Sequence, residues 1–311
     1  MYLARPKRIL MNMMKNTVFA ALGLLFIVSC QKDDDGPTIQ PPRDRGEVQQ
    51  ESEANLEAYL ETHFYNYEDF ENPPADFNYD IVFDTIAGEN SDKTALIDHP
   101  NLKSTQYNYQ EVNYTLYVLE AKEGEGAQPT FADSTFVNYR GNIVGGRKFD
   151  GTTTPIWLNL PETIFGFGNG LKELKAGKGI TQNEDGSFNY GTDYGVGAVF
   201  IPSGLGYFSN PTTSIPAYSD LVFRFKLYSI VKDTDEDGDG IPNALEDVNN
   251  NFYLFEAEDD TDRDGRPNFQ DADDDGDGIL TRDEIVINED GSITFTDSNN
   301  DDTPDYLDPD N

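Results

Sequence analysis

This chain of 311 residues has little of several residue types that catalytic and nucleic-acid-binding proteins rely on. It contains one cysteine, two histidines and one tryptophan, and its 22 lysines and arginines face 58 acidic residues. His63 and His99 lie far apart in the sequence and are isolated, so neither indicates a metal site or a catalytic triad. With a sequence pI of about 4.1 and no basic patch, nucleic acid is not an expected partner.

The N-terminal apolar run, residues 17 to 29, is too short for a spanning helix, which needs about 20 residues. It follows four positive charges in residues 1 to 15, the order of a secretory signal. Ile27-Val28-Ser29-Cys30 resembles the bacterial lipobox, whose cysteine is lipidated and becomes the mature N-terminus. The resemblance implies a signal over 1–30 and an outer-membrane anchor through acyl chains on Cys30. An ordinary cleaved signal is the alternative, and the side of the membrane stays open.

Residues 31–50 are predicted to be a flexible tether, because they are rich in proline and charge. Residues 51–111 are predicted to be an N-terminal extension that contains a helix. Within Glu51–His63, the side chains of Leu56, Tyr59 and Leu60 recur at helical spacing. We expect this helix to pack on the domain that follows, and a dimer contact is the alternative.

The central segment carries an ordered series of motifs. Val137-Asn138-Tyr139-Arg140-Gly141 is followed at once by Gly146-Arg147-Lys148-Phe149-Asp150, a strand, a short turn and then Phe-Asp. Downstream come PIWLNL at 155–160, TIFGF at 163–167, GLKELKAG at 170–177, VFIPSGLGY at 199–207 and an Ile-Pro loop with a final LVFRFKL strand. Residues 181–196 read as an insertion, and Tyr114–Leu119 as a strand.

Over residues 112–231 this series resembles the FKBP-type prolyl isomerases. The resemblance implies an α+β fold, in which an antiparallel sheet wraps on a short helix at 170–176. It also implies a proline pocket, closed on one side by Ile156 and Leu158, whose residues are Tyr139, Phe149, Asp150, Ile164, Phe167, Tyr207, Ile215 and Phe223. Phe167 replaces the usual floor tryptophan, Ile156 replaces a wall aromatic, and Phe208 stands where glycine usually follows the tyrosine.

Such a pocket needs no cofactor for catalysis. The peptide bond resists rotation by about 18–20 kcal/mol, and X-Pro bonds exchange slowly between two populated isomers. A dry pocket that grips the proline ring and prefers the twisted amide lowers this barrier by differential binding. The expected partners are therefore proline-containing segments of exported proteins.

The acidic C-terminal segment, 232–311, has a metal-ligand spacing. From residue 233 onward it carries 28 Asp and Glu against three arginines and no lysine. The pattern D-x-[DN]-x-[DN]-G-x₅-E fits twice, matches nearly once and matches weakly once. The predicted ligands are Asp235, Asp237, Asp239 and Glu246; Asp260, Asp262, Asp264 and Asp271; Asp273, Asp275, Asp277 and Glu284; and Asp297, Asn299, Asp301 and Asp308.

Alternate carboxylates followed by a later one suit Ca²⁺, which takes 6–8 oxygen ligands. Proline at position 8 of several loops is unfavourable for the helix that an EF-hand needs next. The segment instead resembles thrombospondin type 3 repeats, which implies irregular chain stacked around structural Ca²⁺. A disordered acidic tail is the alternative.

Two hypotheses of different class follow. The first is a prolyl isomerase that assists folding of exported proteins at the bacterial outer membrane. The second is a non-catalytic FKBP-like binding or adhesion lipoprotein with calcium-stabilised repeats.

Overall fold

The computed structural model describes residues 41–186 and 188–310. Contacts between residues divide the chain into two units, Met1–Pro42 and Arg43–Asn311, and all the helices and strands below belong to the second unit. The signal segment and Cys30 lie outside the described residues. Among the described residues, no helix is both long and apolar enough to span a membrane.

The first helix, α2 (Arg45–Thr62), begins within the stretch predicted as tether. Asp44 caps it, because its side chain accepts a hydrogen bond from the backbone N–H of Glu47 at 2.9 Å. Its buried positions recur every four residues, at Val48, Ser52, Leu56 and Leu60. The helix packs on the domain as expected, and the tether prediction is wrong for residues 45–50.

Residues 63–101, which the sequence left without a clear assignment, form short elements beside α2. They are β1 (His63–Tyr65), α3 (Tyr67–Glu71), β2 (Phe83–Thr85) and the 3-10 helices η1 (Gly88–Asn90) and η2 (Leu96–Asp98). β1 and β2 pair in antiparallel fashion, with Phe64 opposite Asp84. Aromatic contacts hold much of this extension together, such as Tyr65 against Phe70 at 5.8 Å between ring centroids.

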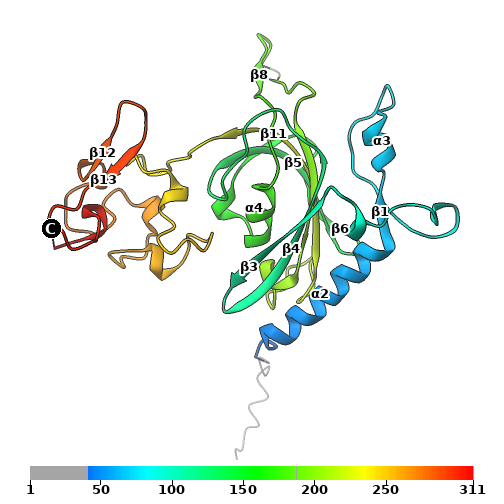
Figure 1. The fold of residues 1–311 in the computed structure, drawn as a ribbon, viewed down its shortest axis with the longest axis horizontal. Coiled ribbons are helices and arrows are strands. Elements are labelled where there is room, and N and C mark those ends of the chain that lie inside the picture. Colours follow the sequence, from blue (N-terminus) through cyan, green and yellow to red (C-terminus); the bar gives the residue numbers. More distant parts are fainter. Residues whose placement is uncertain (1–40, 187, 311) are drawn as a thin grey trace, which may run out of the picture. The chain divides into compact units, whose positions relative to one another are not determined.

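A seven-stranded antiparallel sheet forms the main domain, with the order β3-β4-β10-β11-β5-β6 and with β7 also paired to β5 (Figure 1). The strands are β3 (Leu102–Tyr109), β4 (Val112–Lys122), β5 (Ser134–Ile143), β6 (Lys148–Gly151), β7 (Ile156–Asn159), β10 (Gly195–Ile201) and β11 (Leu221–Val231). The predicted strand 114–119 is therefore confirmed within β4, while β3 extends the sheet upstream of residue 112. The inserted segment carries the small hairpin β8 (Thr181–Gln182) and β9 (Phe188–Asn189).

Successive side chains of β11 point alternately into two apolar layers, one on each face of the sheet. Leu221, Phe223, Phe225 and Leu227 join the larger core, which also contains α4 (Phe165–Leu171). Val222 and Tyr228, on the opposite face, pack with α2 and the N-terminal extension. The sheet is thus covered on both faces, and the α+β class predicted from the sequence is confirmed. The short 3-10 helices η3 (Leu160–Glu162) and η4 (Ser203–Leu205) flank this core.

The short helix lies five residues earlier than predicted, at 165–171 instead of 170–176 (Figure 1). Its sequence, FGFGNGL, has poor helix propensity, but all seven residues are buried. A Cβ at Gly166 would lie 2.4 Å from Cγ2 of Ile201, and one at Gly170 would lie 2.4 Å from Cγ1 of Val199. These glycines share one helix face, and they let α4 approach β10 closely. Tertiary packing therefore overrides propensity here.

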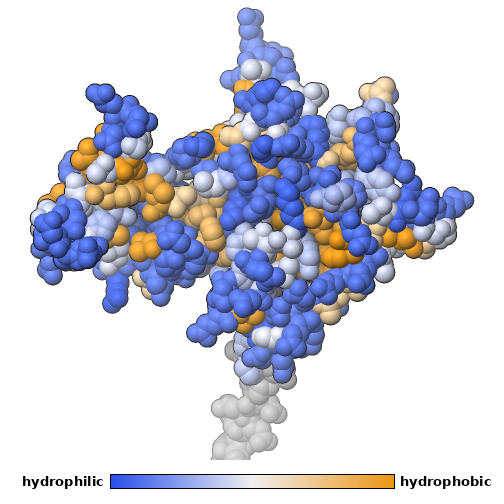
Figure 2. All heavy atoms as spheres, viewed as in Figure 1, coloured by the Kyte–Doolittle hydropathy of each residue, from blue (hydrophilic) through white to orange (hydrophobic). Residues whose placement is uncertain are grey.

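The acidic segment has little regular structure. It contains the 3-10 helices η5 (Asn243–Leu245), η6 (Ala257–Asp259), η7 (Asn268–Gln270), η8 (Thr281–Asp283) and η9 (Asp305–Leu307), and the hairpin β12 (Ile285–Ile287) with β13 (Ile293–Phe295). Its apolar clusters are small; one contains only Ile241, Ile285 and Tyr306 as buried members. On the face shown in Figure 2, hydrophilic residues predominate and hydrophobic ones form scattered spots.

Candidate functional site

The predicted proline-pocket aromatics meet on the larger core. Phe223 of β11 lies 5.0 Å from Phe167 of α4 and 5.4 Å from Phe149 of β6, between ring centroids and with nearly perpendicular planes. Phe167 and Phe223 are each 4% exposed, whereas Phe149 is half-buried. Phe167 and Phe223 therefore form a rigid apolar floor, and Phe149 forms a wall above it.

A glycine makes this wall possible. Gly141 lies opposite Phe223 on β11 and opposite Asp150 on β6. A Cβ at Gly141 would lie 2.7 Å from Phe149 Cζ and 2.8 Å from Phe223 Cε1. The Tyr-x-Gly motif thus places a tyrosine and a bare backbone on the same face of β5, so the two phenylalanines can close over the strand.

A tyrosine and a carboxylate provide the polar part of the site. The Tyr139 hydroxyl donates a hydrogen bond of 2.8 Å to Oδ2 of Asp150, which is exposed. Desolvation, followed by the bond to Asp150, raises the pKa of Tyr139. Desolvation and the nearby Asp150 charge also raise the pKa of Tyr207. Both tyrosines therefore stay protonated at neutral pH and can donate hydrogen bonds.

The remaining predicted pocket residues lie on the same face of the sheet as the aromatic rings. Ile215 is 3% exposed and belongs to the core, while Ile164, Tyr207 and Leu158 are partly buried against it. Ile156 lies opposite Val137 in the β5–β7 pair and is half-buried. The structure therefore gathers the predicted pocket residues around one apolar surface.

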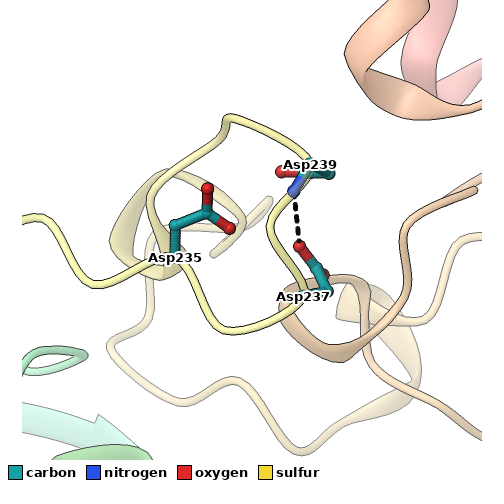
Figure 3. A group of neighbouring side chains, drawn as sticks. All are labelled: Asp235, Asp237 and Asp239. Atoms are coloured by element: carbon teal, nitrogen blue, oxygen red, sulfur yellow. Dashed lines mark hydrogen bonds between the residues drawn. The ribbon is translucent and has the colours of Figure 1, made fainter.

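The first acidic loop, Asp235–Glu246, wraps in the manner that its spacing predicts. Asp235, Asp237 and Asp239 each place a carboxylate oxygen within 4.8 Å of the others (Figure 3). Asp239 N–H donates to Asp237 Oδ1 at 3.1 Å, and Gly240 N–H donates to Asp235 Oδ2 at 3.1 Å. Asp235 Oδ1 also accepts from Gly238 N–H at 2.8 Å, while Asp237 Oδ2 is buried without a hydrogen-bond partner.

A deeper group of three carboxylates joins two loops. Asp239, Glu246 and Asp274 are 2%, 1% and 2% exposed, and their oxygens also lie within 4.8 Å of one another. Five of their oxygens are buried without a hydrogen-bond partner: Asp239 Oδ2, both of Glu246 and both of Asp274. Desolvation first, and then neighbouring carboxylates, raises the pKa of Glu246 to about 11 and that of Asp274 to about 9.

This donor set fits a hard cation. Buried charges of one sign are strongly unfavourable without a compensating partner. Oxygens that share a Ca²⁺ ion at 2.3–2.6 Å lie at most about 5 Å apart, which matches the spacing of this group. Asp274 was not among the predicted ligands; it occupies position 2 of the third loop, which the calcium-loop pattern leaves unassigned.

The other predicted loops are assembled to different extents. Asp260, Asp262 and Asp264 form one group, and Asp273, Asp275 and Asp277 form another. In the described part of the chain, these groups do not include Asp271, Glu284 or Asp308. In the fourth loop, Asn299 donates to Asp308 Oδ2 at 2.7 Å, while Asp301 N–H donates to Asn299 Oδ1 at 3.0 Å.

A fifth loop of the same form was missed. Asn250 and Phe252 have φ of 59° and 67°, as Gly238 and Gly240 have 79° and 104° at the equivalent positions of the first loop. The equivalent hydrogen bonds are present too: Phe252 N–H to Asp247 Oδ2 at 2.8 Å and Tyr253 N–H to Asn251 Oδ1 at 2.9 Å. Asp-x-Asn-x-Asn at 247–251 was the available signal, but phenylalanine at the glycine position concealed it.

This missed loop also joins the acidic segment to the sheet domain. Lys172 Nζ lies 3.6 Å from the centroid of the Phe252 ring, and Asn169 donates to the carbonyl of Phe252 at 3.2 Å. Leu254 is 2% exposed in a cluster with Phe131 and Phe269. Since Asn169 belongs to α4, the acidic segment contacts the helix that carries the pocket floor.

Comparison with known proteins finds FKBP-type relatives that match a little more than a third of the chain. The chain is 34% identical over 119 residues to the "FKBP-type peptidyl-prolyl cis-trans isomerase FkpA" of Buchnera aphidicola (Schizaphis graminum), covering 37% of this chain and 40% of the relative. It is 31% identical over 116 residues to FkpA of Escherichia coli K12, covering 36% of each. The chain thus spans about two fifths of the length of the curated relatives it matches.

A family model described as "BamM C-terminal" matches residues 236–296, within the acidic segment. Among solved structures, FkpA from Escherichia coli has 17% identity and a TM-score of 0.35, covering 74% of each chain. A Pseudomonas syringae peptidyl-prolyl isomerase has 15% identity and a TM-score of 0.36, covering 62% of this chain and all of that one. Such low TM-scores add nothing to the topology described above.

Proposed function

We propose that this protein is an FKBP-type peptidyl-prolyl isomerase that assists the folding of exported proteins at the bacterial outer membrane. The observation that carries the proposal is the Tyr139–Asp150 hydrogen bond beside the Phe149, Phe167 and Phe223 rings. These residues lie in the central segment whose motifs resemble that family, and the FkpA relatives match the chain over 119 residues.

The geometry suits amide rotation without a nucleophile. The apolar floor accommodates a proline ring and excludes water from the amide that precedes it, which disfavours the charge-separated planar form. The Tyr139 hydroxyl donates its one proton to Asp150, so Tyr207 holds the proton that can bond to the substrate carbonyl. Asp150 orients the Tyr139 hydroxyl and can accept an N–H from the substrate backbone. Only contacts that strengthen as the amide twists speed the reaction.

Turnover of X-Pro peptides by the purified protein tests this role. Asp150→Asn and Tyr139→Phe should each lower kcat/KM about tenfold, because each removes a polar contact worth about 1.4 kcal/mol in the transition state. Asp76→Asn, an exposed aspartate of the extension, is the matched control and should leave the rate unchanged. Equal rates in all variants would contradict the pocket assignment. Proline-peptide binding without any turnover would instead favour the non-catalytic binding lipoprotein.

For the acidic segment we propose structural Ca²⁺, and the group of Asp239, Glu246 and Asp274 supports it most strongly. Glu246→Gln removes one charge from this buried group, so calcium affinity should fall about tenfold or more in a calorimetric titration. Glu289→Gln, an exposed glutamate in the β12–β13 turn, is the matched control. An unchanged isotherm for Glu246→Gln would exclude this group as a ligand set.

The membrane location remains a proposal that rests on the N-terminal motif and on the bacterial relatives. Lipid on Cys30 would anchor the protein, and its partners would be proline-bearing segments of exported proteins. Cys30→Ser should abolish palmitate labelling and move the protein from the membrane fraction to the soluble fraction. Retention of label in this variant would defeat the anchor assignment.

A further inference from the structure

A cavity of about 310 Å³ lies between the sheet and residues 79–82 of the extension, and Tyr139 of the proposed proline pocket is among the residues that line it. Four cationic side chains line it, Arg140, Lys148, Arg224 and Lys226, against one carboxylate, Asp80. The residues that line the cavity therefore carry a formal charge of +3, whereas the whole chain has a net charge of −36. Such a local concentration of positive charge is unexpected from the composition.

The cations of this cavity are incompletely compensated. Lys226 pairs with Asp80 Oδ1 at 2.5 Å. Among the described residues, Arg140, Lys148 and Arg224 form no ion pair within 4.0 Å, although carboxylates outnumber cations across the chain. Three positive groups are therefore available to a ligand.

Two of these cations are placed against each other by the strand register. Arg140 of β5 lies directly opposite Arg224 of β11, so both side chains lie on the same face of the sheet. Like charges in this arrangement are destabilising unless an anion lies between them. The Arg140 charge and burial together lower the pKa of Arg224, with burial the larger cause.

Arg224 is fixed in place but not fully satisfied. Its Nη1 donates to the carbonyl of Ile81 at 3.0 Å, and its Nη2 donates to Asn142 Oδ1 at 2.7 Å. Its Nε atom is buried and has no hydrogen-bond partner. A buried guanidinium N–H without an acceptor is unfavourable, so the protein by itself does not fully compensate Arg224.

We propose that this cavity binds a small organic dianion, a phosphate monoester or a dicarboxylate. The volume is at the lower end of ligand pockets, which suits a small molecule. Arg140, Lys148 and Arg224 would bind the anionic groups, while Tyr79, Ile81 and Val82 form an apolar wall for the organic part. At physiological salt the screening length is about 8 Å, so these local cations outweigh the distant negative charge.

Calorimetric titration of the purified protein in calcium-containing buffer tests the proposal, with phenyl phosphate and succinate as probes and phenol as the uncharged control. We expect saturable 1:1 binding of at least one dianion and none of phenol. Arg140→Gln/Lys148→Gln, which changes two exposed residues, should weaken binding about tenfold or more. The matched control is Lys103→Gln/Lys175→Gln, which removes the same charge from exposed sites outside the cavity and should bind normally.

Methyl NMR gives an independent readout, because the signals of Ile81 and Val82 should shift on titration. Absence of saturable binding of both dianions would overturn the proposal, as would an equal loss of affinity in the two double variants. Shifts confined to the acidic segment would assign the binding to Ca²⁺ there and would also overturn it. None of these outcomes depends on isomerase activity.

Discussion

The sheet domain and the acidic segment differ in what holds them together. In the sheet domain, two large apolar clusters cover both faces of seven strands, and its most buried residues include Leu116, Val137 and Phe225. In the acidic segment, one apolar cluster has three buried members and another shares Phe131 and Ala132 with the sheet domain, while the carboxylates of Asp239, Glu246 and Asp274 belong to residues only 1–2% exposed. One region is stabilised by removing apolar area from water, whereas the other buries charges of one sign, for which we propose a cation as the compensating partner.

The two regions also use glycine differently. In α4, Gly166 and Gly170 permit close contact between a helix and a strand, with no requirement on φ. In the acidic loops, Gly240 and Gly278 have φ of 104° and 95°, and a Cβ at Gly278 would meet no atom within 4 Å, so the backbone conformation is what requires glycine there. Packing therefore dominates in one region and chain geometry around carboxylates in the other.

The sharpest way to separate the regions is to remove calcium. Chelation should expand residues 235–308 and open them to proteolysis, because uncompensated carboxylates repel one another, while the sheet domain stays folded. Small-angle scattering together with limited proteolysis measures both effects, and restored Ca²⁺ should reverse them. If the segment stays compact in chelator, its fold does not depend on metal and the comparison fails.

A second prediction concerns only the packing of α4 against β10. Gly166→Ala should lower the free energy of unfolding of the sheet domain by about 1–3 kcal/mol, since the new methyl would overlap Ile201. Gly168→Ala in the same helix is the control. Its nearest neighbours would lie 3.2–3.3 Å away, so we expect a change below about 1 kcal/mol. Chemical denaturation in calcium measures both, and equal effects would argue against the close α4–β10 contact.

The smallest expected effect is a pH dependence of the metal-free protein. Burial raises the pKa of Asp239 to about 6 and that of Asp237 and Asp259 to about 7, above their usual value near 4. A raised folded pKa contributes stability that is complete below pH 4 and is lost as pH rises through the folded value. In chelator, the segment should therefore be more compact at pH 5 than at pH 8, as hydrodynamic radius would show. A constant radius would indicate that these groups are solvated.

Sequence reasoning succeeded in predicting which residues of a local motif lie close together in the structure. Tyr139, Gly141, Phe149 and Asp150 lie close together along the chain, and antiparallel pairing of β5 with β6 brings them into one site. The alternating aspartates at 235, 237 and 239 likewise converge within a single turn of loop. In both cases the relevant residues are near neighbours, so their arrangement depends little on the rest of the fold.

Sequence reasoning failed where contacts between residues far apart in the chain determine the local structure. The helix was placed five residues late because the family resemblance assigned it to residues 170–176, whereas FGFGNGL, which has little helical propensity, becomes helical through burial against Ile201 and Val199. Asp274 was missed because its partners, Asp239 and Glu246, belong to another loop. The fifth loop was missed because Phe252 holds a left-handed conformation within contacts to Lys172 and Asn169.

By itself, the sequence determined the order of the strands' motifs, the acidic spacing and the set of residues from which the proposed proline site is built, because these depend on residue type and short separation. The tertiary structure decided which carboxylates are buried together, that the acidic segment contacts α4, and that Arg140 faces Arg224 across two strands. Those pairings join residues up to 84 positions apart, and only the register of the folded sheet and the packing of loops bring them into contact.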